Sequence, residues 1–189
     1  VTTTIADTTT KFPGREKTNV DVIVDRVTKA YLAGTDGDRS GQWRMPFDTD
    51  KDAVYDAYVS VAKVALPASY DGTEDIKGLE TFRYVIKQDN VPFAAADPVT
   101  GLPMVTDVDV VVWIEPNSGV AVHYFDIATA SALAPDGTKY VRFTADMSYT
   151  DATVPELFAI AEDDKARLTL YGTTLPYSII IIGLIILVF

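Results

Sequence analysis

A chain of 189 residues, of which 48% are hydrophobic, is long enough for one domain of ordinary size with its own core. Its 16 basic and 27 acidic residues give a net charge of −11, which argues against nucleic acid as a partner, because binding to phosphate backbones needs clustered Lys and Arg. The chain contains no cysteine, so disulfides, thiolate catalysis and zinc–thiolate sites are excluded.

The N-terminal part predicts an irregular segment followed by a pair of strands. Residues 1–18 are rich in Thr and lack the basic and apolar regions of a signal peptide, so a leader or anchor would have to lie upstream. Residues 19–27 alternate apolar and polar side chains with period two, and residues 28–32 follow after a tight turn. This pattern predicts a strand and its return strand.

The next part of the chain has weaker periodicity. Residues 34–41 are a cluster of turn-forming residues, and residues 42–46 predict a short strand that Pro46 ends. Between residues 48 and 67 the pattern is mixed, and a helical face is one interpretation; its members would be Val54, Tyr58 and Val61.

Turn signals then frame a half-buried strand. The pairs 71–72 and 77–78 have the composition of tight turns, and residues 81–87 alternate as a strand does. Residues 89–106 contain three prolines, several alanines and Gly101, which predicts a long irregular loop.

A clear antiparallel meander follows. Residues 107–115 predict a strand, residues 116–119 a turn, and residues 120–127 the return strand. A turn at 136–137 and a strand at 139–149 complete the meander.

A helix is expected after the sheet. Thr153 and Glu156 have the spacing of a capping box, so the helix should begin there and run to about Tyr171. Gly172 should end it. Residues 151–172 are therefore expected to form a stalk above a bilayer.

The C-terminal run has no charged side chain from Ser178 to Phe189, and Pro176 suits the first position of a helix. From Pro176 onward the run would cover roughly 21 Å, less than the roughly 30 Å hydrocarbon core, so a buried element is one interpretation. The run is apolar on all sides, which favours a membrane and a truncated transmembrane helix over residues 175–189. Its expected anchor residues are Pro176, Ile179, Ile182, Leu184, Ile186 and Phe189.

Few residues offer catalytic chemistry. The single imidazole, His123, lies inside a predicted strand, which does not favour a nucleophilic triad. Neither a phosphate-binding glycine loop nor a dinucleotide-binding turn is present. We therefore expect no enzyme, no catalytic residue and no cofactor.

A calcium loop is the only metal pattern that the sequence approaches. Asp48, Asp50 and Asp52 have its opening spacing. Ala53 stands where a glycine is needed and Val59 where a bidentate Glu is needed, so no metal is expected.

Aromatic side chains leave two interpretations open. Trp43 and Trp113, with ten tyrosines, could line a ligand groove, or they could be core residues at strand spacing.

Three stretches together resemble a known family: "WRMPFDTDK" (43–51), "YDGTEDIKGLETFRYV" (70–85) and "VVWIEPNSGVAV" (111–122), before a short helix and "TTLP". They are similar to the actinobacterial porin PorA family of membrane-anchored proteins, over roughly three quarters of the chain. Residues 54–66 depart from the family pattern, which has a Trp-Asp-Pro-like stretch there. The motif residues that carry the resemblance are Gly72, Gly78, Tyr84, Trp113 and Gly119.

The resemblance implies a topology and a fold. Family members have an N-terminal span, an extracytoplasmic domain and a second span. The strand "GLETFRY" followed by "WIEPxSG" is also similar to periplasmic lipoprotein-carrier domains, whose curved open sheet holds acyl chains. We expect a mainly β fold: a curved antiparallel sheet, an open half-barrel, over residues 19–150 outside the plasma membrane, with a stalk helix and a transmembrane helix.

Three functions follow as hypotheses. The first is a non-catalytic accessory subunit of an actinobacterial cell-envelope membrane complex, with a respiratory supercomplex as candidate host. The second is binding or transfer of an envelope lipid or glycolipid in the concave face. A true porin is the least favoured, because a pore would need repeated lipid-facing strands. The expected partners are membrane lipids and an integral-membrane protein.

Overall fold

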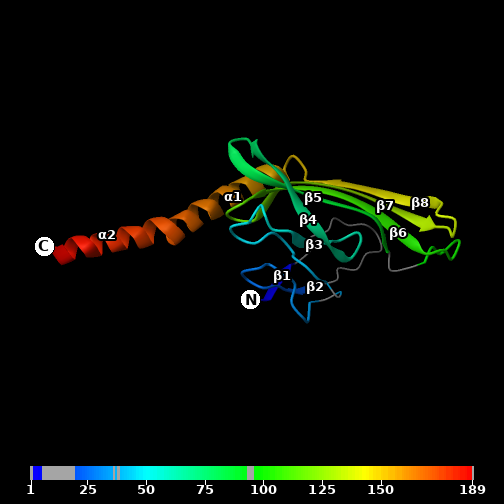
Figure 1. The fold of residues 1–189 in the computed structure, drawn as a ribbon, viewed down its shortest axis with the longest axis horizontal. Coiled ribbons are helices and arrows are strands. Elements are labelled where there is room, and N and C mark those ends of the chain that lie inside the picture. Colours follow the sequence, from blue (N-terminus) through cyan, green and yellow to red (C-terminus); the bar gives the residue numbers. More distant parts are fainter. Residues whose placement is uncertain (1, 6–19, 36, 38, 93–95, 189) are drawn as a thin grey trace.

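A six-stranded antiparallel sheet and one long C-terminal helix make up most of the computed structural model, which describes residues 2–5, 20–35, 37, 39–92 and 96–188 (Figure 1). Each strand of the sheet pairs with the next one along the chain. The strands are β3 (Tyr55–Val59), β4 (Val64–Ile76), β5 (Leu79–Pro92), β6 (Met104–Glu115), β7 (Val120–Leu133) and β8 (Lys139–Ser148). The sheet is open, with β3 and β8 at its edges, and the prediction of a mainly β, curved antiparallel sheet is confirmed.

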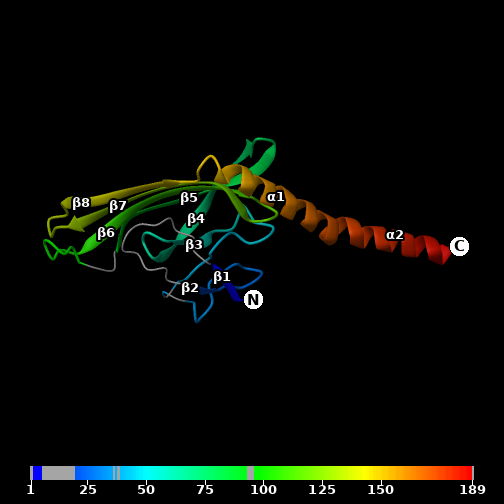
Figure 2. The ribbon, with the colours of Figure 1, turned by 180° about the vertical axis from the view of Figure 1, so that it is seen from behind.

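The sheet curves, and its main core lies on the concave face. The strands arch over the N-terminal segments, as both views of the ribbon show (Figures 1 and 2). Alternate residues of neighbouring strands meet on this face; Tyr84 is paired with Val112, and Ile86 with Val110. Tyr84, Ile86 and Val110 are buried in one hydrophobic cluster. Period-two alternation has therefore placed one side of each central strand in the core.

The N-terminal strand pair differs from the prediction. β2 (Val20–Ile23) pairs with β1 (Thr2–Ile5), not with a return strand over residues 28–32. Val24 and Tyr31 form only a single bridge. The carboxylate of Asp25 accepts hydrogen bonds from the backbone N–H groups that follow it, which starts the turn before the strand can extend. Residues 6–18 of the Thr-rich segment lie outside the described residues.

Two predictions between residues 42 and 68 are wrong. Residues 42–46 are not a strand, since Gln42 makes only isolated bridges to Ala30 and Ala57. The segment from 48 to 67 has no helix and instead contains the β3–β4 hairpin. Val59 and Leu66 of this hairpin are buried in the core, so sheet pairing and burial outweigh the weak helical periodicity.

β4 and β5 are longer than predicted. Residues 71–72 do not turn the chain but sit at a register shift within β4, a bulge beside Gly72. Residues 77–78 do form the tight turn, because Lys77 (φ 55°) and Gly78 (φ 86°) both have the positive φ of a type I′ hairpin.

The predicted irregular loop over 89–106 is shorter in the structure. β5 continues to Pro92 and β6 begins at Met104. Asn90 has a positive φ of 57° at a second register shift, between Gln88 and Val91. This bulge leaves residues 89 and 90 out of the pairing, and the strand continues after it. The meander of β6, β7 and β8 is confirmed; β7 extends beyond its predicted end at 127 to Leu133, and β8 ends at Ser148, one residue before its predicted end.

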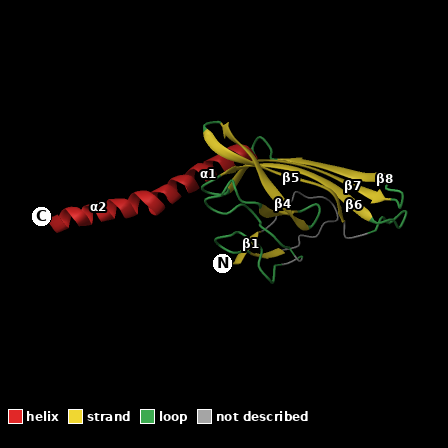
Figure 3. Cartoon of the chain, viewed as in Figure 1, coloured by secondary structure: helices red, strands yellow, loops and turns green. Residues whose placement is uncertain are grey.

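The stalk and the apolar run are one continuous helix from Thr153 to Val188, and its 35 residues Thr153–Leu187 are long and apolar enough to cross a membrane (Figure 3). Its parts are α1 (Thr153–Thr169), a π-helical turn η1 (Leu170–Thr174) and α2 (Leu175–Val188). The predicted capping box is wrong, because the cap residue is Ala152 and makes no side-chain bond. The hydroxyl of Thr150 instead accepts the N–H of Thr153.

Gly172 does not end the helix, and Pro176 is not at its start. The N–H of Leu175 donates to the carbonyl of Leu170, five residues back, which is the wide π spacing. Pro176 has no N–H, and its ring would clash with the carbonyl four residues back in a regular helix. The wider turn just before Pro176 accommodates the proline, so the helix continues.

Candidate functional site

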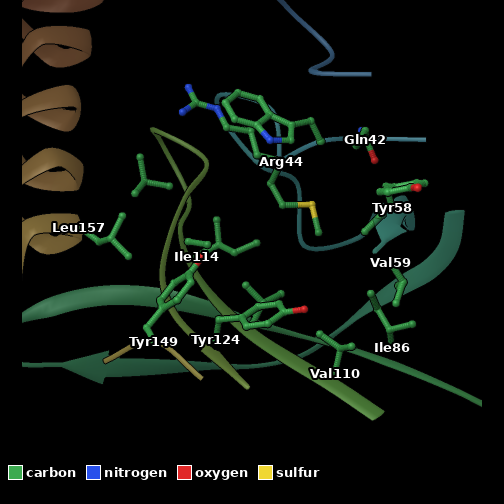
Figure 4. Close-up of a pocket in the computed structure, with 16 residues that line it drawn as sticks. Gln42, Arg44, Tyr58, Val59, Ile86, Val110, Ile114, Tyr124, Tyr149 and Leu157 are labelled. Carbon is green, nitrogen blue, oxygen red and sulfur yellow. The ribbon is translucent and has the colours of Figure 1, made fainter. Parts of the chain in front are cut away.

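An apolar cavity of about 310 Å³ lies on the concave face of the sheet. Its floor is built from the central strands by Ile86, Val110, Val112 and Ile114, and Tyr124 adds an aromatic wall (Figure 4). Leu157 of α1 closes the side nearest the helix. Opposite the floor lies the start of residues 42–52, which we call the strap; its residues 42–45, Arg44 and Met45 among them, line the cavity.

The strap is held in place by the other two motif stretches. The hydroxyl of Tyr84 donates to the carbonyl of Asp50 at 2.9 Å. The backbone N–H of Asp48 donates to Asn117 at 3.0 Å, and that of Thr49 donates to Pro116 at 2.7 Å. The three stretches that carry the family resemblance therefore meet in space, over this cavity.

Gly119 makes the closest approach between the sheet and the strap. A Cβ atom on Gly119 would lie 2.3 Å from the carbonyl oxygen of Met45 and 2.5 Å from that of Pro46. Its φ of +67° also disfavours any side chain. Only glycine fits at this position, which explains the glycine of the Pro-Asn-Ser-Gly turn.

A buried carboxylate joins the same turn to the stalk. Glu115 is fully buried and accepts hydrogen bonds from the Ser118 N–H at 2.8 Å and from the Asn117 side-chain amide at 3.0 Å. The Lys165 ammonium of α1 lies 3.7 Å from Glu115. Phe158 of α1 packs nearby against the base of the sheet. The turn thus couples strap, sheet and stalk.

Tyrosines give the cavity a few polar groups. Tyr149 stacks on Tyr124 with ring centroids 5.5 Å apart, and the Tyr124 hydroxyl donates to Asp126 Oδ2 at 2.9 Å. Asp126 is 1% exposed, and its Oδ1 has no hydrogen-bond partner among the described residues. Burial raises the pKa of Asp126, and burial also raises the pKa of both tyrosines. The phenols are therefore neutral near pH 7, and the cavity suits an apolar molecule.

The two tryptophans lie on opposite faces of the sheet. Trp43 lines the cavity and is 42% exposed. Trp113 lies on the convex face, where its Nε1–H donates to Glu74 at 2.9 Å and its ring centroid is 5.1 Å from that of His123. Of the two tryptophans, only Trp43 fits the groove interpretation, together with the tyrosines that line the cavity, and His123 is not among the lining residues.

The other residues singled out in the sequence are dispersed. Tyr84 and Gly119 hold the strap, whereas Gly72 and Gly78 lie in the β4–β5 hairpin. The expected anchor residues are exposed on α2, namely Pro176, Ile179, Ile182, Leu184 and Ile186; Phe189 lies outside the described residues.

The Asp48–Asp52 segment is a turn of the strap. Asp50 uses its carboxylate to accept the N–H of Asp52 at 2.9 Å. Among the described residues, no group of three or more His, Cys, Asp or Glu side chains is arranged to hold a metal ion.

Sequence reasoning missed Arg44, Met45, Tyr124 and Leu157 as cavity residues. Alternation does not identify Tyr124, because the register shifts at Val122, two residues before it, and Val122 packs in the other hydrophobic cluster. The strap residues carried no signal, since their position depends on contacts with a turn that lies far along the chain.

A comparison with known families agrees with the motif resemblance and extends it. The family model described as "Porin PorA" matches residues 1–189, the whole chain. No curated protein matches the sequence. The family, together with an exposed apolar helix long enough to span a bilayer, indicates a membrane-associated protein. The chain belongs to the porin PorA family.

Proposed function

We propose that the protein is a membrane-anchored, non-catalytic binding protein that holds an amphiphilic molecule, an envelope lipid or glycolipid, in the cavity under the strap. The domain would act on the extracytoplasmic side of the plasma membrane. The observation that carries the proposal is the apolar cavity itself: it lies under the one segment that all three family motifs combine to position.

The size and lining of the cavity support this function. A volume of about 310 Å³ is at the lower end of the range of about 300–1,000 Å³ that small-molecule sites occupy. Aliphatic and aromatic side chains form most of its wall, which favours a hydrocarbon chain over a polar metabolite. The residues that line it include no nucleophile paired with a base, so the cavity supports binding rather than reaction.

The test is to extract the full-length protein in mild detergent and to identify bound lipid by native mass spectrometry. Ala121 lines the cavity, so Ala121→Phe should displace the lipid by filling the space. Ala145 on β8 is half-buried and does not line the cavity, so Ala145→Phe is the matched control. A wild-type protein that carries no lipid, or an Ala121→Phe variant that carries as much as the control, would contradict the proposal.

The edge strand β8 favours a second candidate, an accessory subunit that binds an integral-membrane protein. Apolar side chains on β8 are 40–59% exposed, an unusual composition for an edge strand in water. They are Tyr140, Val141, Phe143 and Met147. Such an edge suits a partner that adds a strand or covers the apolar side chains. The proposed host is an actinobacterial envelope complex, with a respiratory supercomplex as the candidate.

Purification in mild detergent with mass spectrometry of co-eluting proteins tests this candidate. A stoichiometric partner should co-purify with the wild type and should be lost with Val141→Lys, whereas Lys87→Glu on the convex face should retain it. A protein that runs alone under these conditions is not an accessory subunit.

The geometry does not favour a pore formed by the sheet, because β3 and β8 do not pair to close a barrel. We expect the reconstituted protein to show no conductance in planar-bilayer recordings.

A further inference from the structure

Two cationic side chains gather around the ring of Phe47, and one of them, Arg44, lines the cavity. The Nζ atom of Lys29 lies 3.9 Å from the ring centroid of Phe47, and the Cζ atom of Arg44 lies 5.8 Å from the same centroid. In Figure 4, Arg44 lies across the cavity from the floor residues Val110 and Tyr124, with its guanidinium turned away from them. Arg44 thus links the cavity to Lys29, which contacts the same ring from outside the lining residues.

This cation pair has no acidic partner within salt-bridge distance in the described part of the chain. Seven ion pairs join other residues, and neither Lys29 nor Arg44 takes part in any of them. The carboxylates that act on Lys29 from a distance are Asp25 and Asp164. Unlike an exposed cation, Lys29 is buried, so the missing ion pair is not replaced by full hydration.

Both the burial and the backbone conformation of Lys29 are unfavourable for a lysine. It is 7% exposed and has a φ of 59°. This left-handed conformation is energetically unfavourable for residues other than glycine. The carbonyl of Arg26 accepts its ammonium, and its own carbonyl accepts the N–H of Trp43 in the strap. Burial, and next the charge of Arg44, lower the pKa of Lys29. An anion between the two cations would relieve both effects.

Arg44 also retains unused donor capacity. Its Nε is buried and has no hydrogen-bond partner within the ranges that the structure describes. A guanidinium that is partly shielded from water binds a phosphate or carboxylate with charge-assisted hydrogen bonds, which are stronger than neutral ones.

We propose that Lys29 and Arg44 form the head-group site of the cavity, which makes the ligand an anionic amphiphile: a hydrocarbon chain on the apolar floor and a phosphate or carboxylate between the two cations. The inference rests on the proposed binding function and adds the charge of the ligand.

The test uses two photoreactive probes with the same chain, an alkyl phosphate and the corresponding alcohol. Each is added in trace amounts to the full-length protein in lipid nanodiscs, and cross-linked peptides are quantified by mass spectrometry. Cross-links to α2 report exposure to the bilayer and serve as the internal standard. We expect the phosphate probe to label cavity peptides at least about tenfold more than the alcohol.

Variants assign this preference to the cation pair. Lys29→Gln combined with Arg44→Gln should reduce labelling by the phosphate probe to the level of the alcohol, while labelling by the alcohol stays unchanged. Arg44→Lys should retain most of the preference, because it keeps the charge. Lys87→Gln, which removes one positive charge on the convex face, should have no effect. Unchanged alcohol labelling also shows that the double variant keeps its fold.

The outcomes separate the two proposals. If neither probe labels the cavity, the binding function itself is wrong. If both label it equally, the cavity binds chains without regard to charge and the head-group site is wrong. If millimolar inorganic phosphate abolishes labelling by the phosphate probe, the cations bind free phosphate rather than a lipid head group, and the inference is also overturned.

Discussion

At the scale of single residues, buried polar groups and one glycine position the strap over the cavity. Tyr84 reaches Asp50 from the middle of β5, and Glu115 ties together the turn that accepts the strap's backbone N–H groups. The sequence indicated that Tyr84 and Gly119 belong to motifs. It could not indicate their partners, because a Tyr hydroxyl or a glycine without a Cβ acts on whichever backbone the fold brings near.

Gly119→Ala should destabilise the protein more than Gly137→Ala, although both glycines have a positive φ. Gly137 has a φ of +86°, and a Cβ atom added there would meet nothing within 4 Å, so Gly137→Ala should cost about 1–2 kcal/mol for the backbone alone. Gly119→Ala adds the collision with the strap carbonyls and should cost about 3 kcal/mol or more. Urea unfolding of both variants measures the difference. An equal loss of unfolding free energy in both variants would mean that the strap carbonyls do not collide with a Cβ atom at position 119.

The ion pair between Asp97 and Arg142 predicts a pH dependence. Arg142 donates two hydrogen bonds to Asp97, at 3.1 and 2.7 Å, and these, followed by hydrogen bonds from the hydroxyl and N–H of Thr100, lower the pKa of Asp97 to about 2. Because the folded-state pKa lies below the usual 3.8, the stabilisation is fully present above about pH 4 and is lost as the pH falls toward 2.

Arg142→Gln should therefore lower the urea midpoint at pH 6, and the gap from wild type should close toward pH 2. Lys87→Gln, which removes an exposed ion pair, should change the midpoint little at either pH. A gap of constant size from pH 6 to pH 2 would show that Arg142 acts through packing instead.

At the scale of elements, the strands of the meander were predictable and the helix boundaries were not. Residues 107–127 alternate strictly, and a Pro-Asn-Ser-Gly turn separates their two halves, so local sequence determines this hairpin. β3 was missed because its five residues fit a helical face as well as a strand, and only pairing with β4 decides between them. Gly172 is a local signal for the end of a helix and Pro176 for the start of one, but a π turn between α1 and α2 keeps the helix continuous.

The contact between α1 and the sheet depends on one end of the helix. Phe158 and Ala161 are the buried residues of α1, and both lie in its first three turns. Phe158→Ala should lower the free energy of unfolding by about 3 kcal/mol through loss of burial and the cavity left behind. Ile160 is 49% exposed, so Ile160→Ala should cost under about 0.5 kcal/mol.

Chemical unfolding compares the two variants, and limited proteolysis near residues 149–153 reports whether α1 has come away from the sheet. If Ile160→Ala proves as costly as Phe158→Ala, the exposed side of α1 has a partner of its own.

At the scale of the whole molecule, the continuous helix carries an uncharged stretch beyond the charged part of α1. The apolar run from Pro176 alone would cover roughly 21 Å, but the last charged side chain of the continuous helix is Arg167, which pairs with Asp163. Residues 168–188 form an uncharged stretch of about 21 residues, or roughly 32 Å of helix, which matches the roughly 30 Å hydrocarbon core. This uncharged stretch includes the π turn, and the charged part of α1 lies between it and the cavity.

Paired arginines in α2 should release the protein from membranes. Ile182 and Ile185 are exposed by more than half and lie one turn apart, and each arginine near the centre of a span costs about 2.5–3.5 kcal/mol. Ultracentrifugation of broken cells after alkaline extraction should leave the wild type in the pellet and move Ile182→Arg combined with Ile185→Arg to the supernatant. Ile160→Arg in α1, outside the uncharged stretch, should stay in the pellet. A wild-type protein found in the supernatant would mean that α2 packs against protein rather than lipid.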